Sequence, residues 1–155
     1  MKTILVLNGS NLNLLGIHKP AILGPQSLAD VEAVCAAACS AHGFALDFRQ
    51  SNHEGVLIEA LQEAGHAQAS GTLAGVVFNA GAYSHTSIAL HDAILGSGVT
   101  VVELNFANIH TREPFRHHSY IALVAKAVIG GFGAQGYALA IAGLAAMDKA
   151  NNPGC

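Results

Sequence analysis

The stretch TILVLN, residues 3–8, is a continuous run of β-branched and aliphatic residues close to the start of the chain. A strand with one face in water alternates apolar and polar side chains, and this run does not. It is typical of a strand that is buried on both faces. The run therefore predicts a parallel sheet that is covered by helices on both sides.

The rest of the chain alternates between strand-like and helix-like segments. Residues 44–50, 73–79 and 99–105 predict further strands, and residues 27–41, 56–69 and 87–96 have helical spacing. A last apolar run, residues 120–133, leads to a helix over 134–150, with a short strand or a turn between Gly130 and Gly136. This alternation predicts one open α/β domain, residues 1–150, followed by a frayed tail, residues 151–155.

The composition narrows the possible partners. The 155 residues are 52% hydrophobic and only 11% charged, which suggests that part of the surface is covered by other subunits. A net charge of -3 with seven Lys and Arg residues argues against a nucleic-acid partner, because nucleic-acid binding needs a basic surface. No signal peptide follows the N-terminal Met, and glycines and Lys126 interrupt the apolar C-terminal segment. We therefore expect a cytoplasmic protein without a membrane span.

The three cysteines do not form a disulfide framework. Cys35 and Cys39 lie four residues apart on a predicted helix, and Cys155 is terminal. An odd count with such a pair suits a reducing compartment. Zinc binding would need two more converging ligands, so packing in the helix core is the preferred interpretation.

Polar clusters follow three of the predicted strands, and they define the candidate site. In an open α/β sheet, ligands bind at the carboxyl ends of the strands. The clusters offer neutral amides, imidazoles that transfer protons, and two arginines: Asn8, Asn11, Asn79, Asn105, Asn108, His85, His110, His117, His118, Arg112 and Arg116. The combination suits a polyhydroxylated anionic small molecule. Taken singly, each of these residues is also an ordinary turn or cap residue.

Several common site motifs are absent from the sequence. It has no G-x-x-x-x-G-K-[ST] phosphate loop, no G-x-G-x-x-G dinucleotide fingerprint after the first strand, and no G-x-S-x-G elbow. The glycine-rich segment 130–136 opens the last helix and is interpreted as a tight turn or close packing. These absences leave a phosphate-loop or dinucleotide site without support in the sequence.

Five blocks of the sequence resemble one known family. They are ILVLNGSNLNLLG (4–16), DFRQSNHEG (47–55), NAGAYSHTSIALHDA (79–93), REPFRHHSY (112–120) and GFGAQGYALA (131–140). Together they resemble the signatures of the type II 3-dehydroquinate dehydratases over nearly the whole chain. The resemblance implies a flavodoxin-like three-layer sandwich with a five-stranded parallel sheet. It also implies a homododecamer built as a tetramer of trimers. The implied activity is that of a lyase that converts 3-dehydroquinate to 3-dehydroshikimate and water through an enolate, in an anti elimination that needs no metal and no cofactor.

The resemblance also assigns roles to individual positions. Asn11 corresponds to the residue that holds a water near the enolate, and Arg112 to the arginine that lowers the pKa of the catalytic base. Substrate-binding positions, some of which serve a neighbouring subunit's site, correspond to Asn79, Gly81, His85, Asp92 and Arg116.

The chain departs from the family pattern on two loops. The segment GIHKPAILG (16–24) stands where the family typically has a lid such as GTREPEIYG, so the catalytic Tyr is Leu23 and the lid Arg is His18. In the segment ELNFAN (103–108) the general-acid His is replaced by Asn105 and the carboxylate-holding Ser by Ala107.

These departures lead to one hypothesis about the base and two alternative functions. His18 is the candidate substitute base, because an imidazole accepts protons near neutral pH; a solvated loop histidine is the alternative interpretation. The apolar residues of the lid segment, together with Phe106 and Ala107, would also suit a less polar substrate, such as another small carbonyl or oxygenated ring compound. A non-catalytic ligand binder is the third possibility.

Overall fold

Five parallel strands form a single sheet in the computed structural model of the chain, which describes residues 1–17 and 24–154. The strand order is β2-β1-β3-β4-β5, which is the flavodoxin-like order. The strands are β1 (Thr3–Asn8), β2 (Ala45–Gln50), β3 (Leu73–Asn79), β4 (Val101–Asn105) and β5 (Ala127–Gly130). The helices are α2 (Leu28–His42), α3 (Glu54–Ala69), α4 (Ile88–Ser97) and α5 (Gln135–Asn151). The flavodoxin-like fold class is thereby confirmed.

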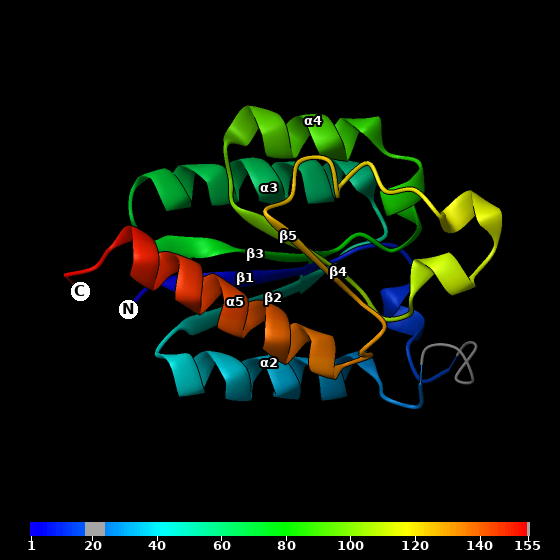
Figure 1. Ribbon diagram of the computed structural model, residues 1–155, viewed down its shortest axis with the longest axis horizontal. Coiled ribbons are helices and arrows are strands. Elements are labelled where there is room, and N and C mark those ends of the chain that lie inside the picture. The colour runs from blue at the N-terminus through cyan, green and yellow to red at the C-terminus, as the bar shows by residue number, and fades with distance from the viewer. Residues whose placement is uncertain (18–23, 155) are drawn as a thin grey trace.

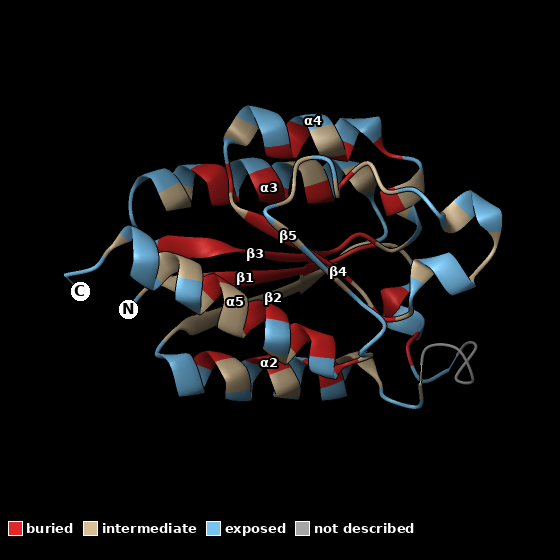
Figure 2. Cartoon of the chain, viewed as in Figure 1, coloured by how far each residue is buried: buried red, intermediate tan, exposed pale blue. Residues whose placement is uncertain are grey.

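The sheet is the middle layer of a three-layer sandwich. Figure 1 shows α3 and α4 on one face of the sheet and α2 and α5 on the other. Strand β1 lies between β2 and β3, and Val6 of β1 pairs with Val77 of β3. Every residue of β3 is buried, as are the last five residues of β1. Figure 2 shows this buried centre, with the exposed residues on the outer faces of the helices. The prediction from residues 3–8 is therefore confirmed.

The position of the last strand agrees least well with the prediction from the sequence. The expected strand or turn between Gly130 and Gly136 is a turn, and the strand lies before it, at Ala127–Gly130. Other boundaries differ by one or two residues: α3 begins at Glu54 and β4 at Val101. Helix α5 runs one residue past the predicted domain end, to Asn151.

Helix α2 begins where the sequence signal places it. Ser27 is the residue before the helix, and its side chain accepts a hydrogen bond from the backbone N–H of Asp30 at 3.2 Å. The Asp30 carboxylate accepts one from the N–H of Ser27 at 2.9 Å. This reciprocal capping box satisfies two of the free N–H groups at the helix start. It fixes the direction in which the chain enters α2.

Within the described residues, no helix is long and apolar enough to cross a membrane. Cys35 and Cys39 are both buried in the core between α2 and the sheet. Burial raises the pKa of the Cys35 thiol to about 12, so this side chain behaves as an apolar packing group. The positions of both thiols agree with the preferred interpretation of the pair.

Candidate active site

The candidate site is a pocket at the carboxyl ends of β1, β3 and β4. It has a volume of about 310 Å³, within the usual range for a small-molecule site. It lies where the strand order reverses between β1 and β3, which is the expected position of a ligand in this fold. It is lined by Ser10, Asn11, Leu12, Leu14, Asn79, Gly81, Ala82, His85, Asn105, Phe106, Ala107, Ile109, Arg112 and Arg116.

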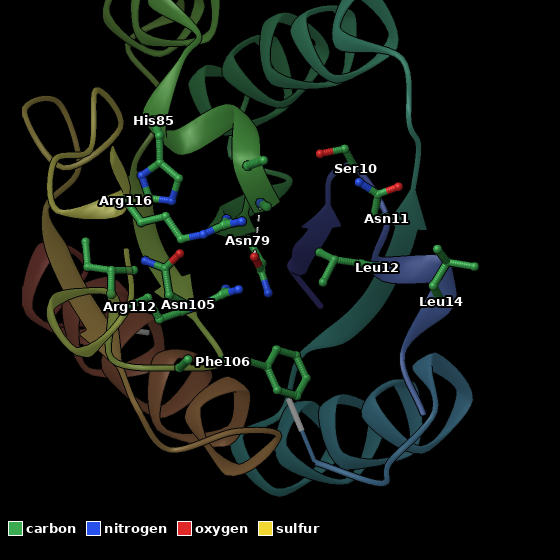
Figure 3. A pocket seen from close by; sticks show the side chains of 14 residues that line it. Ser10, Asn11, Leu12, Leu14, Asn79, His85, Asn105, Phe106, Arg112 and Arg116 are labelled. Atoms are coloured by element: carbon green, nitrogen blue, oxygen red, sulfur yellow. Dashed lines mark hydrogen bonds between the residues drawn. The ribbon is translucent and has the colours of Figure 1, made fainter. Parts of the chain in front are cut away.

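The pocket has two unlike sides. Figure 3 shows His85, Arg116, Arg112 and Asn105 on one side and Ser10, Asn11, Leu12 and Leu14 on the other, with Asn79 between them. One side is therefore cationic and rich in hydrogen-bond donors, and the other is mixed polar and apolar. Such a division suits a molecule with a charged group at one end and a carbon skeleton behind it.

Two glycines allow the loops after β1 and β3 to meet. A Cβ on Gly9 would lie 2.2 Å from the carbonyl oxygen of Ala80, and a Cβ on Gly81 would lie 2.7 Å from that of Ser10. Gly81 also has a φ of 63°, in the left-handed region that side chains disfavour. The backbones pack directly against each other here, and this contact sets the width of the pocket between the two loops.

A buried hydrogen-bond chain holds the floor of the pocket. The Tyr137 hydroxyl, from α5, donates to Asn8 Oδ1 at 2.7 Å and accepts from Asn79 Nδ2 at 3.0 Å. Asn79 Oδ1 accepts from the Gly81 N–H at 3.2 Å. Asn8 and Tyr137 are fully buried and Asn79 is 3% exposed, and burial raises the pKa of the Tyr137 phenol. The two asparagines are therefore fixed in position before any ligand binds.

The cationic side carries a guanidinium that is not fully satisfied. Arg116 Nε donates to Glu113 at 3.0 Å, and the paired charge holds the pKa of that carboxyl below its usual value. Arg112 Nε is 3.9 Å from Glu113, and it is buried without a hydrogen-bond partner among the described residues. Because a buried donor without a hydrogen-bond partner is costly, the arrangement favours an anionic or hydroxyl-bearing ligand beside Arg112.

Asn105 is linked to a buried carboxyl behind the pocket wall. Its Nδ2 donates to Glu103 Oε1 at 3.5 Å, and the Ser119 hydroxyl donates to the same oxygen. Glu103 is fully buried, and desolvation raises the pKa of its carboxyl. Because the amide nitrogen of Asn105 faces Glu103, its Oδ1 is the atom free to accept a hydrogen bond from a ligand or a water.

His85 is held by a reciprocal contact with His118. Its Nδ1 donates to the His118 carbonyl oxygen at 2.7 Å, and His118 Nε2 donates to the His85 carbonyl oxygen at 2.9 Å. The backbone N–H of Tyr120 also donates to the Ser84 carbonyl oxygen at 2.8 Å. These bonds tie the loop after β3 to the segment before β5 and leave Nε2 of His85 for the pocket.

The structure brings together most of the residues that the sequence singled out. Nine of them line the pocket: Asn11, Asn79, Gly81, His85, Asn105, Phe106, Ala107, Arg112 and Arg116. Asp92 does not line it; the residue lies on α4, with a side chain that is 69% exposed and bonded to His91. His18 and Leu23 lie outside the described residues.

Sequence reasoning missed two groups of site residues. The apolar side chains of Leu12, Leu14 and Ile109 line the pocket, but nothing in their local sequence distinguishes them from core residues. Tyr137 and Glu103 hold the pocket asparagines from behind. In the sequence, Tyr137 is a polar aromatic residue in an apolar helix, and Glu103 is an acidic residue in an apolar strand. A buried position for such residues requires a partner, and that was the available signal.

The fold and the pocket define a flavodoxin-like α/β protein with a ligand-sized site at its switch point. Comparison with known proteins gives the family: residues 2–145 match the family described as Dehydroquinase class II. The chain belongs to this family of hydro-lyases.

Individual relatives agree with this assignment over nearly their whole length. The chain is 64% identical over 144 residues to a 3-dehydroquinate dehydratase of Acidovorax sp., covering 93% of this chain and 97% of the relative. It is 54% identical over 150 residues to a 3-dehydroquinate dehydratase of Marinomonas sp., covering 97% and 100% of the two chains. A crystal structure of type II dehydroquinase from Propionibacterium acnes superposes with a TM-score of 0.88 at 34% identity, covering 94% of this chain and 97% of that one.

Proposed function

We propose that this chain is a 3-dehydroquinate dehydratase, which removes water from 3-dehydroquinate to give 3-dehydroshikimate. The relatives with 64% and 54% identity carry that name. The structural observation that carries the proposal is that two arginines, several amides and an imidazole line one pocket. The Nε of one of these arginines, Arg112, is buried and has no hydrogen-bond partner among the described residues. 3-Dehydroquinate is a small ring with a carboxylate, hydroxyls and a ketone, and it offers a partner to each of these groups.

The donors and acceptors of the pocket divide the work of binding. Arg112 and Arg116 neutralise negative charge and donate to ligand oxygens in fixed geometry. Tyr137 orients Asn79, and Glu103 orients Asn105. Because both amides are already ordered, binding to ligand hydroxyls costs little side-chain conformational entropy. Asn11 lies on the opposite side, where a water bound to it would stabilise the oxygen of the enolate.

The reaction requires two proton movements. A base removes a proton from the carbon next to the ketone, which gives an enolate, and an acid protonates the hydroxyl that leaves. Leu23 cannot act as the base, and His18 is the side chain of that segment that accepts a proton near neutral pH. We assign the base role to His18 on this sequence argument, because the residue lies outside the described residues.

Assembly belongs to the same proposal. Large apolar side chains on the described surface include Leu95, Leu123, Val128 and Phe132, which are 55–74% exposed. Exposed apolar groups of this size favour contacts between subunits. A homododecamer arranged as a tetramer of trimers would cover such groups and would bring the exposed Asp92 to a neighbouring subunit's pocket.

The test is direct turnover of 3-dehydroquinate. The purified protein is mixed with 3-dehydroquinate, and the ultraviolet absorbance of the conjugated enone product is followed. A steady increase is expected, and the His18→Ala variant is expected to lose about 10²–10⁴-fold in rate. A flat trace at high enzyme concentration would contradict the proposal. A thermal shift with quinate or shikimate in that case would identify a binder without turnover.

A further inference from the structure

The described lining of the pocket contains three ionisable side chains, and they differ in what they can do. Arg112 and Arg116 keep their protons at all physiological pH values. His85 is the third, and an imidazole both gives and takes a proton near neutral pH. Asn105 has no proton to transfer. Among the described lining residues, acid–base chemistry therefore falls to His85.

We propose that His85 is the general acid of the reaction, giving the proton on its Nε2 to the hydroxyl that leaves. This inference rests on the proposed dehydratase function and adds a catalytic residue to it. His85 and Asn105 lie on the same side of the pocket, with Arg116 beside them (Figure 3). Proton transfer is direct or passes through one water held at Asn105 Oδ1.

The contact with His118 determines which nitrogen of His85 does the chemistry. A carbonyl oxygen only accepts hydrogen bonds, so the 2.7 Å contact requires a hydrogen on Nδ1 of His85 in every protonation state. The mobile proton is therefore the one on Nε2, and the neutral ring is the Nδ1–H tautomer. The bond from His118 Nε2 to the His85 carbonyl oxygen holds the loop that carries the ring.

The charges around His85 come from three directions. Glu103, on β4, supplies negative charge when its carboxyl is ionised. Arg112 and Arg116, on the segment after β4, supply positive charge, and the His118 carbonyl oxygen accepts a hydrogen bond from Nδ1 of the ring. A bound substrate carboxylate offsets the two arginines. These groups set the electrostatic environment of the His85 ring in the complex.

The step balances without any additional reactant. After enolate formation, the electron pair of the enolate forms the carbon–carbon double bond. The carbon–oxygen bond to the leaving hydroxyl breaks, and its electron pair stays on that oxygen. The oxygen takes the Nε2 proton of His85 and departs as water. The ring is left as the neutral Nδ1–H tautomer and regains a proton from solvent.

The test separates the two proton movements of the reaction. His85→Gln keeps an N–H group near the Nε2 position, and His85→Asn keeps a donor for the His118 carbonyl, but neither side chain transfers a proton. The matched control is His42→Gln, since His42 is exposed at the end of α2 and does not line the pocket. Each protein is incubated with 3-dehydroquinate in deuterium oxide. Product formation is followed by absorbance, and deuterium in the recovered substrate is measured by mass spectrometry.

We expect both His85 variants to lose about 10²–10⁴-fold in kcat for dehydration. We also expect them to retain exchange of the carbon-bound proton and to lose the decline in kcat at high pH. Wild-type kcat in both variants, or an increase in KM with kcat unchanged, would overturn the assignment while leaving the dehydratase function standing. Loss of exchange together with dehydration in the folded variants would also overturn it, because His85 would then act before the acid step. Failure of the wild-type protein to dehydrate 3-dehydroquinate would instead contradict the proposed function.

Discussion

Removing the Tyr137 hydroxyl tests whether the pocket floor is part of the folding core. Tyr137→Phe keeps the ring, which packs against Phe106 at 5.6 Å between centroids, and deletes only the oxygen. The change breaks the 2.7 Å bond to Asn8 and the 3.0 Å bond from Asn79, and it leaves two buried polar atoms without their partner. At about 1–3 kcal/mol for each of the two buried groups left unsatisfied, we expect a loss of about 2–6 kcal/mol in the free energy of unfolding.

Urea unfolding and thermal unfolding measure this loss. For a chain of this length, the expected decrease in Tm is roughly 4–24 °C. Tyr83→Phe is the matched control, because the Tyr83 hydroxyl donates at 2.7 Å to the Asn52 carbonyl oxygen at an exposed position where water can replace it. We expect a cost below about 1 kcal/mol there. Equal costs in the two variants would refute the argument that burial of the asparagines makes Tyr137 essential.

Two further changes test the packing and the electrostatics of the site. Gly9→Ala should lower the free energy of unfolding by at least about 1–3 kcal/mol, because its Cβ would lie 2.2 Å from the Ala80 carbonyl oxygen; urea unfolding measures the loss. Gly143→Ala on α5, where no described atom lies within 4 Å of the added Cβ, should instead stabilise by about 0.5–1 kcal/mol, and destabilisation there would contradict the argument. Burial raises the pKa of Glu103, so its ionisation should lower wild-type stability as pH rises above the ordinary carboxyl value of 4.5. Glu103→Gln should lack this decrease when unfolding is compared at acidic and neutral pH, and an identical pH dependence in the two proteins would show that Glu103 is not its source.

The buried strands of the fold could be predicted from the sequence, and the edge strand could not. Residues 3–8 and 73–79 are uninterrupted apolar runs, and a central parallel strand is the structure that buries both faces of such a run. Strand β5 has four residues, alternates between intermediate and exposed, and lies inside a longer apolar segment. Periodicity does not distinguish a short strand from a helical turn in such a segment. The pairing of Val102 with Ala127 is a long-range contact that places this strand in the sheet.

The site shows the same division between local and long-range information. The rule that ligands bind at strand ends was sufficient to collect Asn79, His85 and Asn105 into one pocket. It did not predict Tyr137, which is 129 residues away from its partner Asn8. The rule also could not predict that Asp92 lies on the exposed face of α4, because helical spacing alone does not say which face of a helix packs against the sheet.

The floor and the wall of the pocket are stabilised by different contacts, and this difference bears on how the chemistry of the family can change. The floor residues Asn8 and Asn79 are bonded to Tyr137 in the core, so a substitution there affects folding. The wall segment after β4 is held by its own bonds, such as that from His117 Nε2 to the Arg112 carbonyl oxygen at 2.8 Å, and by the His85–His118 contacts with the loop after β3. Substitutions at wall positions such as Ala107 can therefore alter which groups meet the ligand at little cost in stability. A different division of proton transfer among the wall side chains is therefore compatible with an intact fold.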